Sequence, residues 1–265
     1  QAKEGKFILS PATAIQADPA FSNEAALLKE ELESFTSFKF NANQNYTNTI
    51  LLALDNTLPT EAYTLSVSNN QIKISASEPI GIFYAIQSLK SAMPLVAWKT
   101  KQESLDVPCM EVKDQPRFGY RGLHIDVARN FQTKEQVKRV LNWMAMYKLN
   151  KLHFHFSEDD AWRVEIPALP ELTTVGVKRG HTLDSKENMP ASYGSGGDIN
   201  NIQSSFYTRN DYIDILKHAK SKFIDVIPEI ETPGHARAAI KAMDARYARL
   251  MKEGKSEEAK QYLLS

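Results

Sequence analysis

Alternating apolar and polar residues mark the strand candidates of this chain, and the stretch at 148–166 (KLNKLHFHFSEDDAWRVEI) carries most of its chemistry. Side chains of a β-strand point alternately to its two faces, so His153 and His155 share one face, opposite a leucine and two phenylalanines. Three consecutive acids follow at 158–160. We expect them at the end of the strand, because a loop can solvate like charges that a sheet interior cannot. Acidic and imidazole groups at the carboxyl ends of strands are typical of active sites in α/β barrels.

The first part of the chain, residues 1–113, predicts a separate α+β domain. Apolar residues at steps of three and four predict one helix that starts at about Ser22 and another over 79–93. The pair Asn69-Asn70 is typical of a hairpin turn, because asparagine tolerates positive φ. No cluster of catalytic character occurs here, so we expect a structural or positioning role. Strand candidates lie at 7–9, 49–54, 62–68, 71–76 and 107–112.

The second part, residues 114–265, shows repeating strand–helix units. Its strand candidates lie at 120–127, at the HxH stretch and at 223–228. Helices are expected from Thr133, where Thr133-x-x-Gln136 forms a capping-box signature, and from Thr208. The tail from about residue 236 to 264 also has a helical pattern. Strands that alternate with helices of this length predict parallel βαβ units.

Composition excludes several classes of protein. The 32 basic and 32 acidic residues cancel, so no basic surplus points to a nucleic acid partner. No run approaches the roughly 20 apolar residues of a membrane span. The single cysteine, Cys109, excludes an internal disulfide. The chain begins at Gln1 rather than methionine, which indicates either processing or a trimmed sequence. A removed secretory signal is one explanation, and from it we expect a secreted, periplasmic or cell-surface protein.

Three motifs in order resemble one enzyme family. RGLHIDVARNF at 121–131, the 148–166 stretch and VIPEIETPGHARAA at 226–239 closely resemble the opening part of the catalytic barrel of family 20 glycoside hydrolases, the β-N-acetylhexosaminidases. The resemblance implies an α/β fold class, with an accessory α+β domain followed by an incomplete (β/α)8 TIM barrel. A complete barrel needs about 250 residues, so we expect 114–265 to be only its N-terminal part.

The resemblance also implies a reaction and a substrate. The family removes terminal β-linked N-acetylhexosamine from carbohydrates, and the substrate's own 2-acetamido group acts as nucleophile to form an oxazolinium intermediate. An Asp-Glu pair in a GGDE-like motif supplies the proton chemistry. No such motif occurs here, so we expect no catalytic residue in this chain and place the pair beyond Ser265. The fragment alone should be inactive. The alternative is a non-catalytic, carbohydrate-binding remnant of the same fold.

The family pattern assigns a substrate contact to Arg129, which matches the arginine that binds hydroxyls of the terminal sugar. A guanidinium fork suits vicinal hydroxyls and keeps its charge at any working pH. The alternative role is a structural ion pair with Asp126 or another acid. Trp162 and Tyr207 are candidates to stack on sugar rings, although a large residue just after a strand is more often a lid over the core edge.

The same pattern assigns supporting roles to residues beside the substrate. Glu158 matches the acid, usually aspartate, that partners the histidine of the PGH motif, which is His235 here. In the family this pair orients and tunes the catalytic acid. Because Glu158 is one methylene longer than the usual residue, Asp159 is an alternative partner. Glu231 likewise replaces the usual aspartate, so two departures fall in one network.

The two histidines of the HxH have a second interpretation, as a metal site. An HxH on a barrel strand with a nearby aspartate is how metal-dependent amidohydrolases begin. That arrangement normally uses the first strand, whereas His153 and His155 fall on the second, and no further His or Lys is placed to complete a binuclear site. We therefore expect no metal and no cofactor. The histidines are interpreted as hydrogen-bonded at the barrel mouth, with direct sugar contact by His155 as the candidate role in binding.

Overall fold

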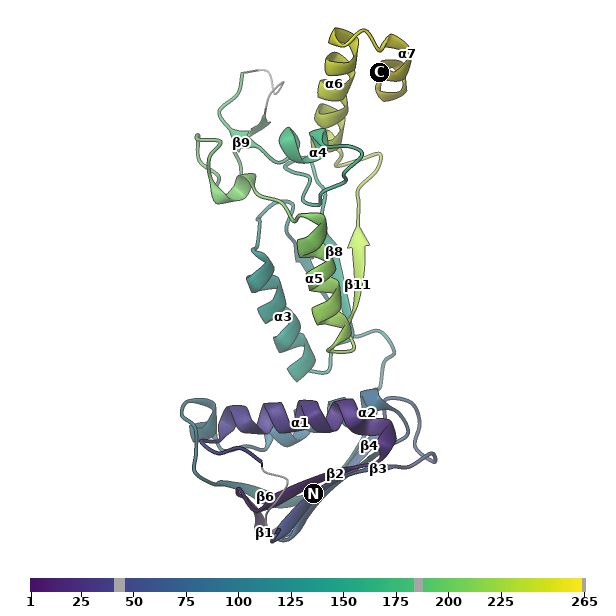
Figure 1. Cartoon of the computed structure of the whole chain (residues 1–265). Coiled ribbons are helices and arrows are strands. Elements are labelled where there is room, and N and C mark those ends of the chain that lie inside the picture. The colour runs from purple at the N-terminus through teal and green to yellow at the C-terminus, as the bar shows by residue number, and fades with distance from the viewer. Residues whose placement is uncertain (41–45, 184–187, 264–265) are drawn as a thin grey trace. The chain divides into compact units, whose positions relative to one another are not determined.

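The computed structural model describes residues 1–40, 46–183 and 188–263, and the chain divides into two compact units. The first unit spans Gln1–Gly119 and the second spans Tyr120–Ser265 (Figure 1). Each unit has its own sheet and its own helices. Within the described ranges, no helix is both long and apolar enough to cross a membrane.

The first unit is a six-stranded sheet with helices packed on one face (Figure 1). The expected hairpin is present, since β4 and β5 pair antiparallel and the amide of Ser68 donates to the carbonyl of Gln71 at 2.8 Å. The strand β2 was not expected from the sequence. The strands in spatial order are β1 (Ala2–Leu9), β6 (Leu105–Asp114), β4 (Tyr63–Val67), β5 (Gln71–Ala76), β3 (Asn48–Leu54) and β2 (Thr13–Ala17), and the helices are η1 (Pro19–Phe21), α1 (Ser22–Phe35), α2 (Pro79–Ser91) and η2 (Leu95–Trp98).

The core of the first unit lies between this sheet and its helices. Helix α2 buries residues around most of its circumference, including Ile82, Ile86 and Leu89. The alternate residues Leu65 and Ile74 of the paired strands β4 and β5 are fully buried. The sheet therefore has one apolar, covered face, and the residues between these positions form its open face.

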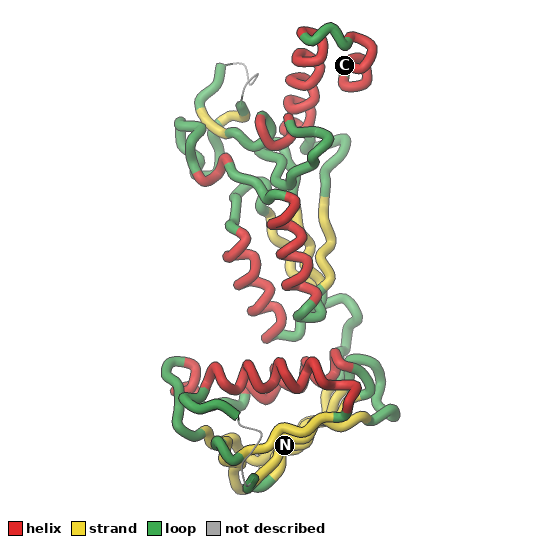
Figure 2. Tube along the Cα trace, viewed as in Figure 1, coloured by secondary structure: helices red, strands yellow, loops and turns green. Residues whose placement is uncertain are grey.

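The second unit is built on a three-stranded parallel sheet in the order β11-β8-β7 (Figure 2). Helices α3 (Lys134–Met146) and α5 (Arg209–Lys220) pack beside each other along one face of that sheet. Each helix begins with a capping box, at Thr133 and Thr208, as the sequence predicted for the first of them. The strands are β7 (Gly122–Asp126), β8 (Lys151–His155) and β11 (Asp225–Glu229).

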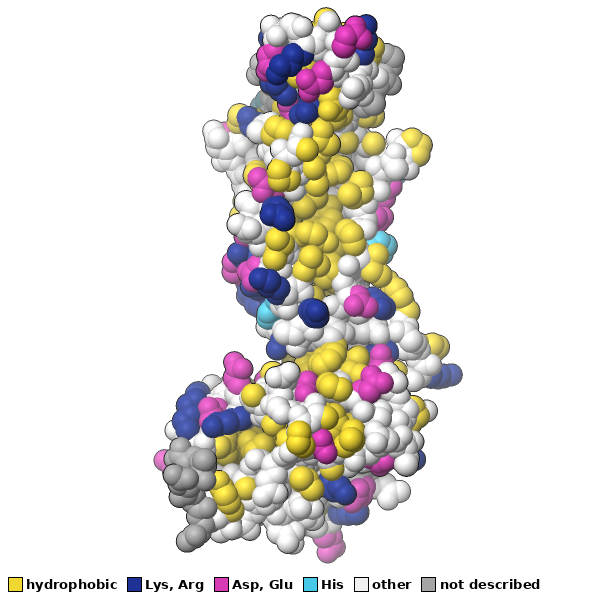
Figure 3. All heavy atoms as spheres, turned by 45° about the vertical axis from the view of Figure 1, so that its right-hand side comes forward, with side chains coloured by type: hydrophobic (Ala, Val, Ile, Leu, Met, Phe, Trp, Pro, Cys, Tyr) yellow, Lys and Arg dark blue, Asp and Glu magenta, His cyan; other side chains and the backbone are white. Residues whose placement is uncertain are grey.

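Register in this sheet decides which side chains share its open face. His124 pairs with His153, and Asp126 pairs with His155, which in turn pairs with Glu229. The intervening residues of β8 are fully buried against the helices, as the alternation predicted. Among the described strands, β11 forms one edge of the sheet, and apolar side chains are exposed over this unit (Figure 3).

The connections after β8 and β11 carry short elements. Between β8 and α5 lie α4 (Glu171–Thr174), β9 (Arg179–Gly180), β10 (Met189–Pro190) and η3 (Ile202–Ser204). The tail was expected to be helical to residue 264, but α6 (Arg237–Lys252) ends before Gly254, whose φ is +77°. A left-handed glycine just past the last turn commonly ends a helix. Two more short helices follow, α7 (Ser256–Ala259) and η4 (Lys260–Tyr262), and residue 264 lies outside the described residues.

Candidate active site

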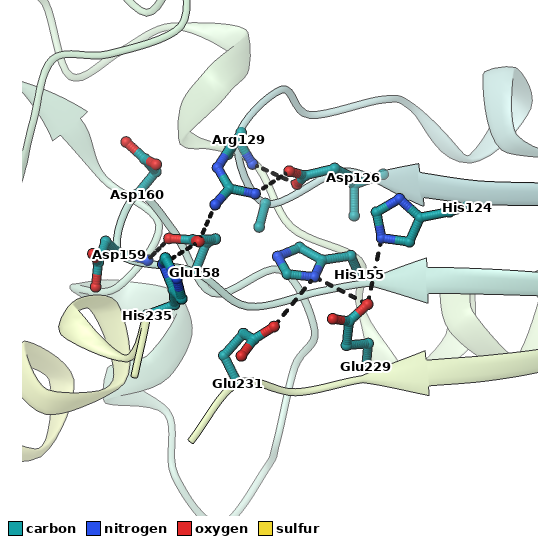
Figure 4. Close-up of polar contacts among 12 residues, drawn as sticks. His124, Asp126, Arg129, His155, Glu158, Asp159, Asp160, Glu229, Glu231 and His235 are labelled. Atoms are coloured by element: carbon teal, nitrogen blue, oxygen red, sulfur yellow. Dashed lines mark hydrogen bonds and ion pairs between the residues drawn. The ribbon is translucent and has the colours of Figure 1, made fainter. Parts of the chain in front are cut away.

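Arg129 lies just beyond the carboxyl end of β7 and bridges two carboxylates (Figure 4). Its Nη1 donates to Asp126 Oδ2 at 2.6 Å, and its backbone amide donates to Asp126 Oδ1 at 3.0 Å. Its Nη2 donates to Glu158 Oε1. The Arg129 side chain is still 33% exposed. The ion pair with Asp126 is therefore present, and it leaves the guanidinium accessible from solvent.

Glu158 joins this arginine to His235, the histidine of the PGH motif (Figure 4). Glu158 Oε1 lies 2.7 Å from His235 Nδ1, which confirms the contact expected from the sequence. The Glu158 side chain is only 3% exposed, whereas His235 is 59% exposed. Asp159, the alternative partner, instead accepts a hydrogen bond at 3.0 Å from the amide of Arg237 at the start of α6. The longer side chain of Glu158 thus contacts both Arg129 and His235.

The local charges favour the ionised network. Burial raises the pKa of Asp126, but hydrogen bonds from the amide and the guanidinium of Arg129 outweigh it, so the pKa of Asp126 lies below its usual value. The hydrogen bond to Asp126 raises the pKa of Arg129 in turn. Both groups are therefore charged at neutral pH, and the site presents an arginine held between two acids.

Arg163 holds the turn that carries Arg129 and is itself fully buried. It donates to the backbone carbonyls of Val127 and Ala128, both at 2.8 Å, and to two carbonyls of the 203–205 segment at 2.7 and 2.8 Å. Burial lowers the pKa of Arg163 to about 9. One guanidinium therefore clamps the end of β7 to the connection that leads into α5.

Arg179 forms a second clamp from the loop after β8. It is fully buried, and it donates to the carbonyls of Arg129 at 2.7 Å, of Asp160 at 3.0 Å and of Ala128. Burial lowers its pKa as well. The sequence interpretation missed both arginines. In the sequence, the one signal was the pair Trp162-Arg163. Arginines that bind backbone carbonyls need no particular partner residue, so the sequence carries no pattern that marks them.

A second cluster, of histidines and carboxylates, lies on the open face of β7, β8 and β11 (Figure 4). His153 Nε2, His155 Nδ1 and His124 Nε2 lie 2.7, 3.2 and 3.4 Å from one atom, Glu229 Oε2. Burial acts to raise the pKa of Glu229, and the groups around it, with His155 first among them, outweigh burial and lower that pKa. His124 was not singled out from the sequence, because only the register of β7 against β8 places it beside His153.

Glu231 lies next to this cluster rather than in the arginine network. Its Oε1 is 3.8 Å from His155 Nδ1, and its backbone amide donates to Ser157 Oγ at 2.9 Å. The two glutamates that replace aspartates in the family pattern, Glu231 and Glu158, therefore contact different partners. The sequence analysis placed both substitutions in one network, and the structure separates them, with Glu231 beside His155 and Glu158 beside Arg129 and His235.

The aromatic candidates for sugar stacking are both buried. Trp162 is 7% exposed and donates its indole N–H to the carbonyl of Val164 at 2.6 Å. Tyr207 is fully buried, packs against Phe131 and Phe154, and donates its hydroxyl to the carbonyl of residue 132. Trp162 and Tyr207 are therefore packing residues at the edge of the core. Tyr207 has no open ring face for a ligand, and a sugar contact by Trp162 stays a prediction.

Comparisons with known proteins place both units in one family. Residues 118–263 match the catalytic domain of glycosyl hydrolase family 20, and residues 1–115 match domain 2 of the same family. Among curated relatives, an N,N'-diacetylchitobiase of Vibrio harveyi is 45% identical over 203 residues, which is 77% of this chain and 22% of the relative. A β-hexosaminidase of Vibrio furnissii is 36% identical over 243 residues, covering 91% of this chain and 37% of the relative.

Solved structures agree with these sequence matches. An exo β-N-acetylglucosaminidase of Vibrio harveyi, solved with N-acetylglucosamine, superposes with a TM-score of 0.80 at 33% identity and covers 92% of this chain and 36% of its own. A β-N-acetylhexosaminidase of Bacteroides fragilis gives a TM-score of 0.73 at 29% identity, over 94% of this chain and 46% of its own. The chain thus spans less than half the length of each of these relatives.

Proposed function

Because the chain belongs to glycoside hydrolase family 20, we propose that it is the accessory domain and the first part of the catalytic barrel of a retaining exo-β-N-acetylhexosaminidase. The substrate is a carbohydrate with a terminal β-linked N-acetylhexosamine. The observation that carries this proposal is the accessible Arg129 guanidinium, fixed by Asp126 and Glu158 at the carboxyl end of the sheet.

Arg129 is the proposed contact to the hydroxyls of the terminal sugar. A guanidinium has five N–H donors, and within the described part of the chain the side-chain contacts of Arg129 use one on Nη1 and one on Nη2. The other donors are available for a ligand. Two acids and the buried clamps restrict the rotamers of Arg129 before substrate arrives, so little conformational entropy is lost on binding.

Glu158 and His235 are proposed to support the catalytic acid rather than touch the sugar. Glu158 occupies Nδ1 of the His235 ring, so the other ring nitrogen, Nε2, is left to contact the acid that protonates the leaving oxygen. The buried carboxylate fixes the orientation of the ring.

The proposed reaction needs an Asp-Glu pair that these residues do not supply. The nearest run to the GGDE motif is Gly196-Gly197-Asp198, and it continues with Ile199 in place of glutamate. We therefore take the pair from another part of the protein. There, the aspartate polarises the 2-acetamido group for attack on the anomeric carbon, and the glutamate protonates the leaving oxygen and later activates water.

Hydrolysis of two chromogenic sugars tests this function. The complete protein should release nitrophenol from 4-nitrophenyl β-N-acetylglucosaminide and not from the matched β-glucoside, which lacks the acetamido nucleophile. The 265-residue chain alone should cleave neither. Equal cleavage of both sugars would rule out substrate assistance. A complete, folded protein that binds N-acetylglucosamine without turnover would support the carbohydrate-binding remnant instead.

A further inference from the structure

Three imidazoles and a carboxylate converge on the open face of the second sheet. Figure 4 shows His124 and His155 beside Glu229, with Arg129 beyond the strand ends. We propose that His124, His153, His155 and Glu229, here called the histidine cluster, bind a divalent transition-metal ion of the Zn²⁺ class. This site goes beyond the proposed hydrolase function and does not depend on it. Three strands contribute, because β7 supplies His124, β8 supplies the HxH pair and β11 supplies the glutamate.

The spacing of the ligand atoms fits a small tetrahedral ion. Zinc binds histidine nitrogen at about 2.0–2.1 Å and carboxylate oxygen at about 2.0–2.2 Å, so neighbouring ligands of a tetrahedral site lie about 3.3 Å apart. The three distances from imidazole nitrogens to Glu229 Oε2 are 2.7, 3.2 and 3.4 Å. The ligand atoms of His124, His153 and Glu229 all lie within 4.8 Å of one another. The ligand atoms of His155, Glu229 and Glu231 form a second such group, so an ion bound by all three histidines and Glu229 requires the His155 side chain to rotate toward the other two.

Unpaired buried atoms in the histidine cluster give an independent observation. His155 is 4% exposed, and neither of its ring nitrogens makes a hydrogen bond to any described residue. Glu229 Oε2 is also buried, and its close contacts are the three imidazole nitrogens of His153, His155 and His124 at 2.7, 3.2 and 3.4 Å. Buried polar atoms without partners are uncommon, and a bound ion is one way to satisfy them. A cation at the centre would pair the carboxylate oxygen with the imidazole nitrogens.

The donor set selects the class of metal. Three imidazole nitrogens and one carboxylate oxygen suit Zn²⁺, Co²⁺, Ni²⁺ or Cu²⁺, whereas Mg²⁺ and Ca²⁺ prefer oxygen ligands. The His124 and His153 side chains are partly exposed, so an ion can enter from solution. The sequence predicted no metal because the HxH pair by itself completes no site. Strand register adds the first-strand histidine and the glutamate.

Calorimetric titration of the untagged, metal-free 265-residue chain with Zn²⁺ tests the site. We expect one ion per chain with a Kd of about 10 μM or tighter at pH 7. The variants His124→Ala, His153→Ala and Glu229→Gln should each weaken binding at least about tenfold, because each removes one ligand. His218→Ala is the matched control, since His218 lies on α5 and contacts Asn142. The Zn²⁺ affinity of this variant should equal that of the parent chain.

Two further measurements distinguish metal binding at the histidine cluster from metal binding elsewhere on the chain. Co²⁺ in the parent chain should give visible d–d absorption typical of a low-coordinate nitrogen site, and Zn²⁺ but not Mg²⁺ should displace it. Circular dichroism of each variant verifies folding. If an alanine variant unfolds, Glu229→Gln still tests the site, because glutamine has nearly the same shape as glutamate. A Kd weaker than about 1 mM overturns the proposal. Zinc affinity that Glu229→Gln and His124→Ala leave unchanged, or that only His235→Ala abolishes, overturns it as well.

Discussion

The two sheets of this molecule follow the same alternation but place different side chains on their open faces. In the first unit, the open face carries exposed ion pairs such as Lys3 with Glu111 at 2.8 Å and Lys6 with Asp106 at 2.7 Å. In the second unit, it carries imidazoles and carboxylates that converge on Glu229 and, at the strand ends, the acids around Arg129. Both open faces are polar, and only the second gathers groups that bind or transfer protons.

Residue type, rather than polarity, therefore separates a solvated sheet face from a functional site in this molecule. Long lysines reach water from any strand, and such exposed pairs contribute only about 0–1 kcal/mol to stability. Short histidine and aspartate side chains stay close to the strand, so their partners must come from neighbouring strands. The cations differ as well, since Lys6 is largely exposed whereas Arg163 is fully buried on backbone carbonyls.

The largest expected effect comes from removing a buried cation. Arg163→Met should destabilise the second unit by at least about 3 kcal/mol, because four backbone carbonyls lose their donors. Lys6→Met is the matched change in the first unit and should alter stability by no more than about 0.5 kcal/mol. Hydrogen exchange read by mass spectrometry reports each unit separately under increasing urea. Equal, small effects of the two substitutions would remove the distinction between the two units.

A second prediction concerns Arg129, which the proposal uses for binding. In the complete protein, Arg129→Lys should lower kcat/KM for an aryl β-N-acetylglucosaminide about a hundredfold, or about 2.7 kcal/mol, because an ammonium cannot reproduce the guanidinium fork. Steady-state kinetics measure this, with Lys6→Met as the control for a lost cation elsewhere. Unchanged kinetics in a folded variant would reduce Arg129 to a structural ion pair with Asp126.

A smaller effect distinguishes the carboxylates by their surroundings. Hydrogen bonds from Arg129 keep the pKa of Asp126 below its usual 3.8, despite burial, and the hydrogen bond from Lys3 lowers the pKa of Glu111 from 4.5. The lowered pKa of Asp126 in the folded state means that its stabilising contribution is complete above pH 3.8 and is lost as pH falls through the folded value.

Carbon-detected NMR titration of both carboxyl groups measures these pKa values directly. Salt at about 1 M should return the pKa of Glu111 most of the way to its usual value and change the pKa of Asp126 less, because screening is strongest at the exposed pair. Should salt shift both groups equally, the Asp126 contact would be no better protected from solvent than a surface pair.

Much of the fold could be predicted from local pattern. The strand Gln71–Ala76 was placed at its observed bounds, and the capping box at Thr133 marked the start of α3. Local signals failed where tertiary contacts decide. The short strand β2 forms because it pairs with β3, and the tail breaks at Gly254 although its charged helical pattern runs on.

The candidate site was predictable only in part. The contact between Glu158 and His235 followed from the family motifs and is present at 2.7 Å. The arginine clamps were missed because a guanidinium that binds carbonyls needs no partner side chain. His124 required the register of two strands that lie far apart in sequence. These contacts depend on strand register and on the packing of loops against one another, which cannot be read from composition or motif spacing.

The most direct test of the difference between the two sheets is a crystal structure of the complete protein with N-acetylglucosamine. We expect the Arg129 guanidinium to donate to sugar hydroxyls at about 2.7–3.2 Å, while Asp126 and Glu158 keep their present contacts and the open face of the first unit stays unoccupied. A sugar bound away from Arg129, with the arginine engaged only by its two acids, would contradict the assignment of the second sheet as the substrate site.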